Sequence, residues 1–379
     1  MIYMIAGEAS GDLLGAGLME SISEATSGNV SFHGVGGQMM QGQGMKSLFP
    51  MQDLSVMGIA EVVPQIPKLL KRIRQTVDHI IEQQPDVVVT IDSPDFCFRV
   101  VKALKKRGYR KPCVHYVAPS VWAWRPNRAR KVAQFLDHIL CLLPFEPPYF
   151  ERYSLPATYI GHSAVEGGAV DGNAKRFRKS FDVSSSDTLL ALLPGSRQGE
   201  IKRHLDLFMK TAMQVEKKYQ ELTCVIPTLP HFKAQIEETL KTYPIKSIVV
   251  DSEQDKYDSF AAANLALAAS GTVTLELALA NTPTVVSYRM SPLTSLIARY
   301  VVKTKYVSLV NLILDKPAVP ELLLNNARVE TLSEALLSIL NRRDVSKAQL
   351  ESFKALKEQA ALGGLMPSQV AAQVVLDLV

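Results

Sequence analysis

Short apolar runs alternate with amphipathic segments along most of the chain. The apolar runs span residues 1–6, 30–34, 86–91, 113–117, 138–143, 158–161, 189–193, 223–227, 247–250, 265–269 and 284–287. In segments between them, such as residues 66–83 and 99–107, apolar residues recur every three or four positions. Strands with continuous apolar runs, separated by helices, are typical of parallel sheets that helices cover on both faces. The pattern therefore predicts an α/β protein.

The chain is long enough for two domains of similar size. Residues 161–173, GHSAVEGGAVDGN, are rich in glycine and other small residues and interrupt the strand–helix rhythm. We place the domain boundary near residue 165, between Rossmann-like domains at 1–165 and 166–349, followed by a mostly helical tail. Ligands of such folds bind outside the carboxyl ends of the strands. A cleft faced by both sets of strand ends is the expected site.

Composition narrows the function classes only slightly. The 379 residues are 47% hydrophobic and 21% charged, and the net charge of +5 permits an anionic partner without demanding one. The four cysteines have no metal-ligand spacing, so we expect buried thiols in a reducing cytoplasm. The sequence predicts neither a secretory signal nor a membrane-spanning helix. We expect no nucleic-acid partner.

A predicted strand ends in a candidate anion site in LLALLPGSRQGEI. A tight turn contains Gly195, Ser196 and Arg197, and a helix follows from about Glu200. Backbone N–H groups at a helix start, together with a fixed positive charge, suit a pyrophosphate. The alternative is an ordinary strand–turn–helix with a surface arginine.

A similar strand end occurs in AASGTVTLELALA. Ser270 or Thr272, on either side of Gly271, can cap the next helix, and Glu276 lies one turn inside it. A single carboxylate on an apolar helix suggests a directed hydrogen bond, for example to ribose hydroxyls. The alternative is an exposed helix residue.

Carboxylates gather at two strand ends of the first half. Asp92 and Asp95 follow a strand in VVVTIDSPDFCFRV, where they suit a general base or a sugar-hydroxyl ligand, although Asp95 can also cap a helix. The first loop, GEASGD, carries Glu8 and Asp12 where a dinucleotide fold would hold pyrophosphate. Metal dependence is not expected, because the chain has neither a D-x-D pair nor a His/Cys cluster with ligand spacing.

Two further segments combine apolar and basic residues. In PSVWAWRPNRAR, Trp122 and Trp124 stand beside Arg125 and other arginines. These residues suit the binding of a phosphorylated amphiphile; the alternative is that the tryptophans are ordinary packing residues. In SVMGIAEVVPQIPKLLKRIRQ, an apolar cluster precedes a basic run, which suits a membrane surface or an amphipathic helix packed on its own sheet. The candidate membrane residues are Val62, Val63, Ile66, Lys68, Lys71 and Arg72.

Eight motifs occur together in a fixed order. They are GEASGD, PSVWAWR, LPFE, IGH, LLPGSR, ASGT with its glutamate, YRM and YVSLVNLI. In this set the chain resembles the lipid-A-disaccharide synthases, glycosyltransferases of the GT-B type that act in bacterial outer-membrane assembly. Each motif is weak alone, but their joint order is highly specific.

The resemblance implies an inverting transfer that needs no metal or other cofactor. It joins UDP-2,3-diacylglucosamine to 2,3-diacylglucosamine 1-phosphate, forming a β(1→6) disaccharide and releasing UDP. The second domain would bind UDP, and the tail, about 350–379, would pack back on the first, acceptor-binding domain. Such an enzyme would be cytoplasmic and peripherally bound to the inner membrane; acyl-chain preference and oligomeric state remain open.

The resemblance also assigns roles to the candidate residues. Asp95 is the first choice for the general base, with Asp92 and Glu8 as alternatives. Arg197 and helix N-terminal amides would stabilise the charge that builds on UDP. The residues expected to bind the donor or its UDP part are Gly195, Ser196, Ser270, Gly271, Thr272, Glu276 at the ribose, and Asn311 at the nucleotide or donor sugar. The acceptor side would use Ser10, Gly11 and Asp12 near the reacting sugars, with Trp122 and Arg125.

Three rival functions remain. A UDP-N-acetylglucosamine epimerase uses two such domains but needs no apolar–basic patch. A GT-B enzyme acting on a polyprenyl-linked sugar is closer in chemistry. The segments PSVWAWR and YVSLVNLI argue against both. A non-catalytic nucleotide-sugar-binding protein would not need the acids at the strand ends.

Overall fold

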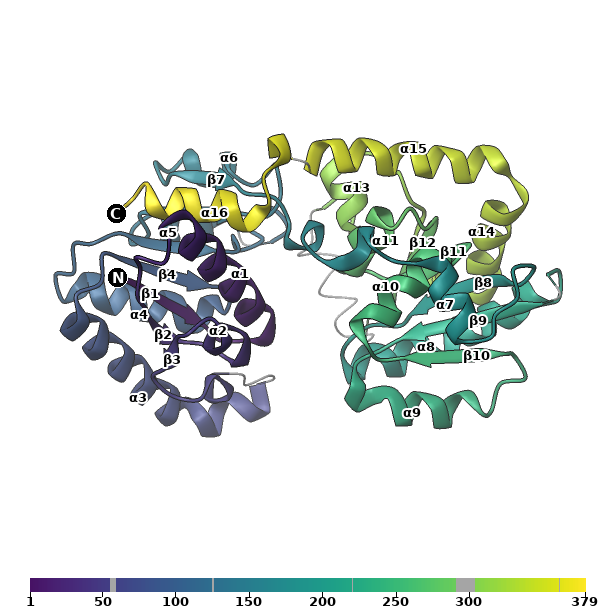
Figure 1. Cartoon of the computed structure of the whole chain (residues 1–379), viewed down its shortest axis with the longest axis horizontal. Helices are drawn as coiled ribbons and strands as arrows, with labels where there is room; N and C mark the ends of the chain where they lie inside the picture. Colours follow the sequence, from purple (N-terminus) through teal and green to yellow (C-terminus); the bar gives the residue numbers. More distant parts are fainter. Residues whose placement is uncertain (55–58, 125, 220, 291–303, 361) are drawn as a thin grey trace. The chain divides into compact units, whose positions relative to one another are not determined.

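The chain folds into two compact units. A computed structural model describes residues 1–54, 59–124, 126–219, 221–290, 304–360 and 362–379, and for residues 59–64 and 362 it describes the backbone alone. Unit 1 comprises Met1–Ser163 with Ala361–Val379, and unit 2 comprises Ala164–Ala360 (Figure 1). The sequence placed the boundary near residue 165 and the start of the returning tail near residue 350.

Unit 1 is built on a parallel sheet. Its strands are β1 (Ile2–Ala6), β2 (Phe32–Val35), β3 (Lys46–Ser47), β4 (Val87–Ile91), β5 (Cys113–Tyr116), β6 (His138–Cys141) and β7 (Ala157–Tyr159). They lie in the order β3-β2-β1-β4-β5-β6-β7, and every described pair is parallel.

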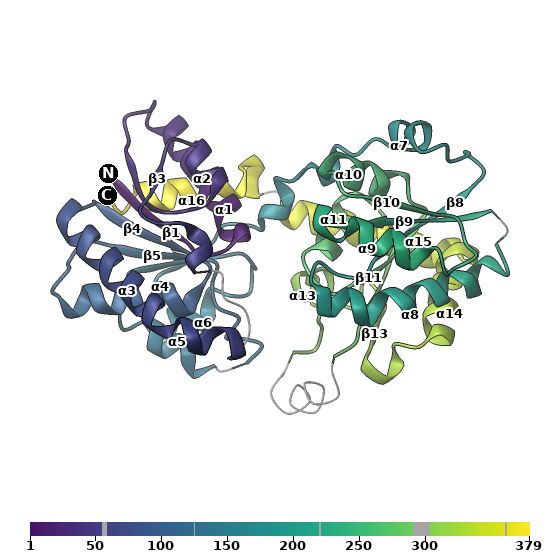
Figure 2. The same cartoon turned by 90° about the horizontal axis from the view of Figure 1, so that it is seen from below.

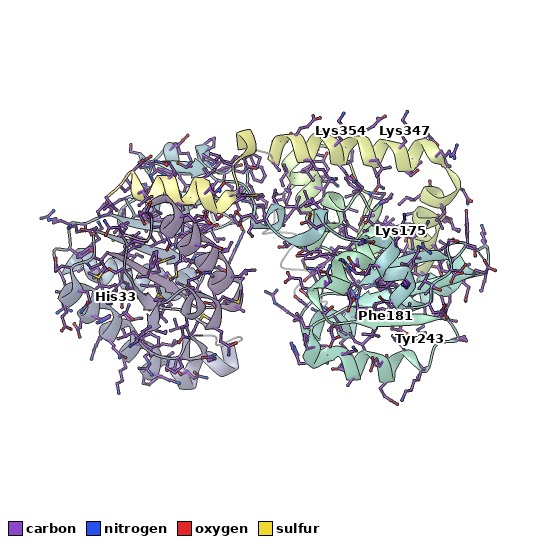
Figure 3. The ribbon with its side chains drawn as sticks, in the orientation of Figure 1. His33, Lys175, Phe181, Tyr243, Lys347 and Lys354 are labelled. Atoms are coloured by element: carbon purple, nitrogen blue, oxygen red, sulfur yellow. The ribbon has the colours of Figure 1, made fainter. Side chains whose placement is uncertain are left out.

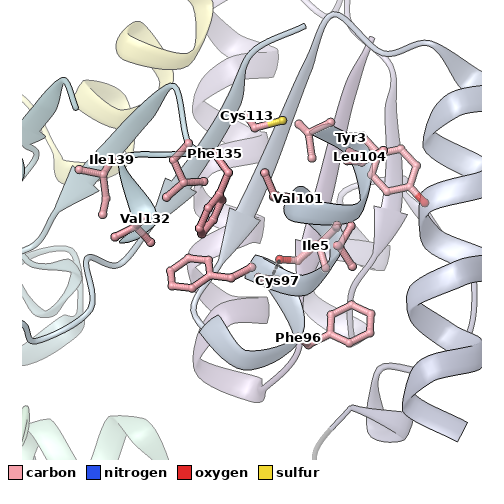
Figure 4. Packing of buried hydrophobic residues seen from close by; sticks show 14 of the residues in the cluster. Tyr3, Ile5, Phe96, Cys97, Val101, Leu104, Cys113, Val132, Phe135 and Ile139 are labelled. Carbon is pink, nitrogen blue, oxygen red and sulfur yellow. Dashed lines mark hydrogen bonds between the residues drawn. The ribbon is translucent and has the colours of Figure 1, made fainter. Parts of the chain in front are cut away.

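Helices cover both faces of this sheet. They are α1 (Ala9–Ala25), α2 (Gln38–Gly42), α3 (Ile59–Gln83), α4 (Pro94–Lys106), α5 (Asn127–Val132), α6 (Pro148–Glu151) and α16 (Pro367–Leu376), with 3-10 turns at Met51–Asp53 and Leu362–Gly364. Tyr3 and Ile5 point to the core that α4 covers (Figure 4), whereas Ile2 and Met4 point to the core under α1 and α16. Strand residues are therefore buried on both faces, as their continuous apolar runs predicted.

Unit 2 contains a second parallel sheet. Its strands are β8 (Thr188–Leu193), β9 (Leu222–Pro227), β10 (Ser247–Val250), β11 (Leu265–Ala269), β12 (Thr284–Tyr288) and β13 (Glu321–Leu323). Their order is β10-β9-β8-β11-β12-β13, and every described pair is parallel.

The helices of unit 2 also lie on both faces of its sheet (Figure 2). They are α7 (Ala174–Ser180), α8 (Gln198–Glu216), α9 (Pro230–Leu240), α10 (Glu253–Ala262), α11 (Val273–Leu279), α13 (Leu309–Leu314), α14 (Val329–Asn341) and α15 (Arg343–Ala360), with 3-10 turns at Gly168–Val170 and Leu324–Asn326. A further 3-10 turn, Ser163–Val165, spans the boundary between the units. Helix α15 is amphipathic: Lys347 and Lys354 point outward (Figure 3), while Phe353 and Leu356 are buried.

Both sheets have the strand order of a Rossmann fold, and each has one point where that order reverses. In unit 1 the reversal lies between β1 and β4, and in unit 2 it lies between β8 and β11. Ligands of doubly wound sheets bind beside such a switch point, at the carboxyl ends of the strands. The loops after these four strands therefore define where each unit is expected to bind its ligand.

Candidate functional site

The switch point of unit 1 brings two acidic loops together. Strands β1 and β4 pair in register from Ile2 to Ala6, so the loop with Glu8 lies beside the loop with Asp92. The Ser10 hydroxyl donates to the Asp92 carboxylate at 3.3 Å. A Cβ on Gly7 would lie 2.5 Å from the Ser93 hydroxyl oxygen, so this close approach requires glycine.

The backbone of the second loop is strained. Asp92 and Ser93 have φ of 50° and 41°, in the left-handed region that side chains disfavour. Val117, after the neighbouring strand β5, has φ of 80°, which is rare for a β-branched residue. Strained residues of this kind cluster at functional sites, and these three lie at the same edge of the sheet as the acidic loops.

Asp95 lies in the first turn of α4 and does not cap it; Ser93 occupies the N-cap position, without a side-chain cap hydrogen bond in the described structure. The Asp95 carboxylate is fully exposed and lies 3.9 Å from an Nη2 of Arg128. Arg128 comes from α5 and lies over the Phe98 ring, 5.5 Å from its centroid. This exposed carboxylate, beside the anchored Arg128 cation, is accessible to a substrate hydroxyl.

Asp12 is buried instead of facing the loop. Its carboxylate accepts hydrogen bonds from the backbone N–H groups of Gly37, Met39 and Met40, at 2.7, 3.0 and 3.1 Å. These amides belong to the start of α2, where a negative charge also suits the helix dipole. The geometry gives Asp12 a structural role in tying α1 to α2, and its contact with a sugar stays a prediction, as does that of the adjacent Gly11.

The PSVWAWR loop is anchored to the LPFE turn through Trp122. The indole Nε1–H donates to Glu146 at 3.0 Å, and the ring meets Phe145 edge-on with centroids 5.1 Å apart. The other Glu146 oxygen accepts from the N–H of Leu143. Burial raises the pKa of the Glu146 carboxyl to about 7, although both hydrogen bonds oppose this shift. Arg125, the predicted acceptor residue in this loop, lies outside the described residues.

Helix α3 carries the expected membrane segment. Ile66 and Leu70, one turn apart, are 43% and 47% exposed, and Lys71 beside them is exposed. Lys68 and Arg72 both pair with Asp53 at 2.6 Å. The side chains of the predicted residues Val62 and Val63 lie outside what is described.

At the switch point of unit 2, the turn after β8 has the form that the motif predicted. Gly195 has φ of 119°, and a Cβ there would lie 2.5 Å from Glu200, so the position requires glycine. The Arg197 side chain is exposed. The Ser196 N–H donates to the Glu200 carboxylate at 3.1 Å, and one Nη of Arg197 lies 3.7 Å from the same group. Glu200 therefore occupies donors that an anion was expected to use.

The loop after β11 lies beside this turn, because β8 and β11 are paired. The predicted side-chain cap is wrong: Thr272 occupies the cap position of α11 without making that hydrogen bond in the described structure, and the Ser270 hydroxyl donates to the Val307 carbonyl. Glu276 is only 12% exposed and pairs with Lys256 at 2.8 Å, which rules out an exposed helix residue. A Cβ on Gly271 would meet open space.

Asn311 is buried in α13, and both ends of its amide are used. Its Nδ2 donates to the Val319 carbonyl and to Glu321, and its Oδ1 accepts from the N–H of Val319. The residue borders a cavity of about 620 Å³ beside β13 and α15. These contacts favour a role in shaping the segment, and a direct nucleotide contact stays a prediction.

Three site residues were missed in the sequence: Glu146, Glu200 and His204. Glu146 stands in the LPFE motif, and Glu200 was noted only as a helix start. His204 lies on the same helical face as Ile201, Leu205 and Phe208, and it is completely buried. A polar residue within the apolar stripe of a helix is the signal that could have identified it.

Two kinds of feature are absent from the part of the chain that the structure describes. Within the described ranges, no three His, Cys, Asp or Glu side chains gather in a way that could hold a metal ion. None of the helices described is both long enough and apolar enough to span a bilayer.

Comparison with known proteins identifies the family. The sequence profile of the family "Lipid-A-disaccharide synthetase" matches residues 2–374. The chain is 47% identical to the lipid-A-disaccharide synthase of Rhodospirillum centenum, over 100% of this chain and 94% of the relative. It is 42% identical to that of Paramagnetospirillum magneticum, over 100% and 97%.

Solved structures with much lower identity share the fold. The UDP-GlcNAc 2-epimerase of Neisseria meningitidis, bound to UDP-GlcNAc, aligns with a TM-score of 0.66 at 12% identity, covering 99% of each chain. MurG of Acinetobacter baumannii aligns with a TM-score of 0.58 at 13% identity, also covering 99% of each. These likenesses confirm the GT-B fold, whereas the sequence matches decide against the epimerase alternative. Matched along nearly its whole length, the chain belongs to the lipid-A-disaccharide synthase family.

Proposed function

We propose that the chain transfers the diacylglucosamine unit of UDP-2,3-diacylglucosamine to the 6-hydroxyl of 2,3-diacylglucosamine 1-phosphate. The products are the β(1→6)-linked disaccharide 1-phosphate and UDP. The observation that carries this proposal is the family match over residues 2–374. The paired switch-point loops of each unit supply polar groups where such substrates are expected to bind.

Unit 2 is assigned the donor. The exposed Arg197 guanidinium stands at the start of α8, where a diphosphate would also meet the positive end of the helix dipole. Charge builds on the UDP oxygen as the glycosidic bond breaks, and a fixed cation stabilises it without a metal ion. Glu276, held by Lys256, is assigned to the ribose hydroxyls.

Unit 1 is assigned the acceptor and the general base. The 6-hydroxyl oxygen forms a bond to the donor anomeric carbon while the bond from that carbon to UDP breaks, with inversion. The hydroxyl proton passes to the Asp95 carboxylate, which is fully exposed in the first turn of α4, just after β4. Asp92, already bonded to Ser10, and Glu8 are the alternatives.

We assign α3 to the membrane surface. Exposed Ile66 and Leu70 can enter the lipid interface, while Lys71 meets anionic head groups. Lys68 and Arg72 are already paired with Asp53, so they contribute less charge than the sequence suggested. The protein would then act at the cytoplasmic face of the inner membrane, where its acylated substrates lie.

A product assay tests the reaction. Purified protein is mixed with both substrates in detergent and EDTA, and the products are read by mass spectrometry. A tetraacyl disaccharide 1-phosphate with UDP is the expected result. UDP binding without this product would refute the proposed reaction, and activity lost in EDTA but restored by a divalent cation would refute metal independence.

The same assay tests Asp95. Asp95→Asn should lower kcat by about 10²–10⁴-fold, because general base catalysis contributes on that scale. Its affinity for UDP should stay unchanged. The matched control is Asp78→Asn, another exposed carboxylate of unit 1, which pairs with Arg107 away from the strand ends. Equal losses of turnover and UDP affinity in Asp95→Asn would assign this residue a structural role instead.

A further inference from the structure

His204 connects two segments of unit 2 that are far apart in the sequence. Its ring lies in α8, with Nδ1 3.0 Å from the Pro194 carbonyl oxygen and Nε2 2.9 Å from the backbone nitrogen of Arg289. Pro194 opens the turn after β8, and Arg289 follows the last residue of β12. The imidazole thus bonds the PGSR turn to the YRM segment.

The partners determine the tautomer of this ring. A carbonyl only accepts, so Nδ1 carries the proton, and a backbone N–H only donates, so Nε2 must be unprotonated. A second proton would set two donors against each other at Arg289. Burial lowers the pKa of the His204 ring, and this effect outweighs the Pro194 carbonyl and Glu200, which raise it. The lowered pKa agrees with a neutral imidazole.

A second side chain of α8 connects the same two segments one turn earlier. One Glu200 oxygen accepts from the N–H of Ser196, and the other accepts from the Tyr288 hydroxyl at 3.2 Å. The rings of Tyr288 and His204 are also in contact, with centroids 5.2 Å apart. The turn after β8 is therefore held at Pro194 and at Ser196 by a single helix.

Gly195, which lies between Pro194 and Ser196, has no space for a side chain. Gly195 has φ of 119°, and any larger residue would collide with the Glu200 side chain. Arg197 comes directly after Ser196, so the position of its backbone depends on the attachments at Pro194 and Ser196. The attachments therefore set where the Arg197 side chain leaves the backbone, while the side chain itself is 68% exposed to a ligand.

We propose that His204 is a positioning residue of the donor site, which fixes the turn 194–197 against the end of β12 so that Arg197 and the turn meet a nucleoside diphosphate preorganised. This inference rests on the proposed function, because it takes the turn as the diphosphate site. His204 itself is buried and acts through Pro194 and Arg289.

Calorimetric titration with UDP tests this role, at a temperature where every variant is folded. His204→Leu fills the space but removes both hydrogen bonds, and it should weaken UDP binding at least about fivefold, since each bond contributes modestly. His204→Asn can restore the bond to Pro194, and His204→Gln can restore the bond to Arg289. Both should bind UDP with intermediate affinity.

Two controls separate the possible causes. Val215→Ala removes a fully buried side chain from the same helix, away from the turn, and should lower the melting temperature without changing UDP affinity. Arg197→Ala tests the donor site itself and should weaken UDP binding. If His204→Leu bound UDP as tightly as wild type, or lost no more UDP affinity than Val215→Ala, the inference would be overturned. The proposed donor site would still stand if Arg197→Ala bound UDP more weakly than wild type. Wild-type affinity in Arg197→Ala would overturn both.

Discussion

The buried carboxylate of Glu146 connects two loops, and its charge state changes near neutral pH. It is 3% exposed and accepts from Trp122 and Leu143. Burial raises the pKa of its carboxyl to about 7. The folded protein therefore retains this proton at a pH where the unfolded chain has lost it. Glu146 contributes stability at low pH that is lost as the pH rises toward 7.

Replacing Glu146 with glutamine should remove this pH-dependent contribution. Between about pH 5 and about pH 8, the free energy of unfolding of wild type should fall relative to that of Glu146→Gln by up to about 3 kcal/mol. The NH₂ group of the glutamine would face the N–H group of Trp122 or of Leu143, so two donors would meet. This lowers the free energy of unfolding of the variant by an amount that does not vary with pH. Urea unfolding at several pH values measures the difference, with exposed Glu151→Gln as the control. Parallel curves for wild type and Glu146→Gln would contradict the raised pKa.

At the scale of elements, the long apolar strands were predictable, whereas two of the four edge strands were not. Runs such as residues 86–91 and 189–193 are buried on both faces and lie within a residue of the observed β4 and β8. Strands β3 and β13 were missed, because Lys46–Ser47 and Glu321–Leu323 each begin with a charged residue and form no apolar run. Strand β7 also has three residues with none fully buried, yet it was predicted from the run 158–161. A strand could be identified only where its sequence contains an apolar run, which β3 and β13 lack.

The candidate site was predictable in its residue types but not in its pairings. The carboxylates at strand ends follow from the motifs and the parallel-sheet rule. The bonds from His204 to Arg289 and from Trp122 to Glu146 join residues 85 and 24 positions apart, so no local pattern reports them. The same holds for Asp12, whose three backbone donors come from another helix.

The basic residues of α3 have two different environments: Lys68 and Arg72 pair with Asp53, whereas Lys71 is exposed. This difference leads to a prediction for membrane binding. Arg72 pairs with Asp53 and lies over the Phe49 ring, 4.5 Å from its centroid, while Ile66 and Leu70 remain exposed. Ile66→Ser with Leu70→Ser should weaken binding to vesicles of phosphatidylglycerol and phosphatidylethanolamine at least about tenfold, because two apolar side chains no longer enter the interface. Arg72→Ala should chiefly lower stability.

Vesicle flotation of the double variant measures this effect. The control is Leu229→Ser in unit 2, which replaces a side chain of similar exposure, 42%, outside α3. Equal losses in the control and the double variant would show that general surface hydrophobicity, not α3, drives binding. Unchanged binding in both would support the packed amphipathic helix instead.

At the scale of the whole molecule, each unit has its own sheet and its own cores, and the chain returns to unit 1 only at its end. Helix α16 packs on α1, with Ala371, Ala372 and Val375 in the same core as Met4. The Ser21 hydroxyl donates to that of Ser368 at 2.9 Å, which joins residues 347 positions apart. Unit 1 therefore cannot complete its core until the last residues are in place, whereas unit 2 is one continuous segment.

This division predicts two separable unfolding transitions. Val375→Ala in α16 and Val215→Ala in α8 each remove about 2 kcal/mol of apolar burial from a fully buried position, one in each unit. Each should lower one calorimetric transition, by about 2–4 °C per kcal/mol, and leave the other in place. UDP should raise only the transition that Val215→Ala lowers, because a ligand stabilises the unit that binds it. If both variants lowered the same single transition, the two units would unfold as one cooperative structure. If UDP raised only the transition that Val375→Ala lowers, the donor site would belong to unit 1.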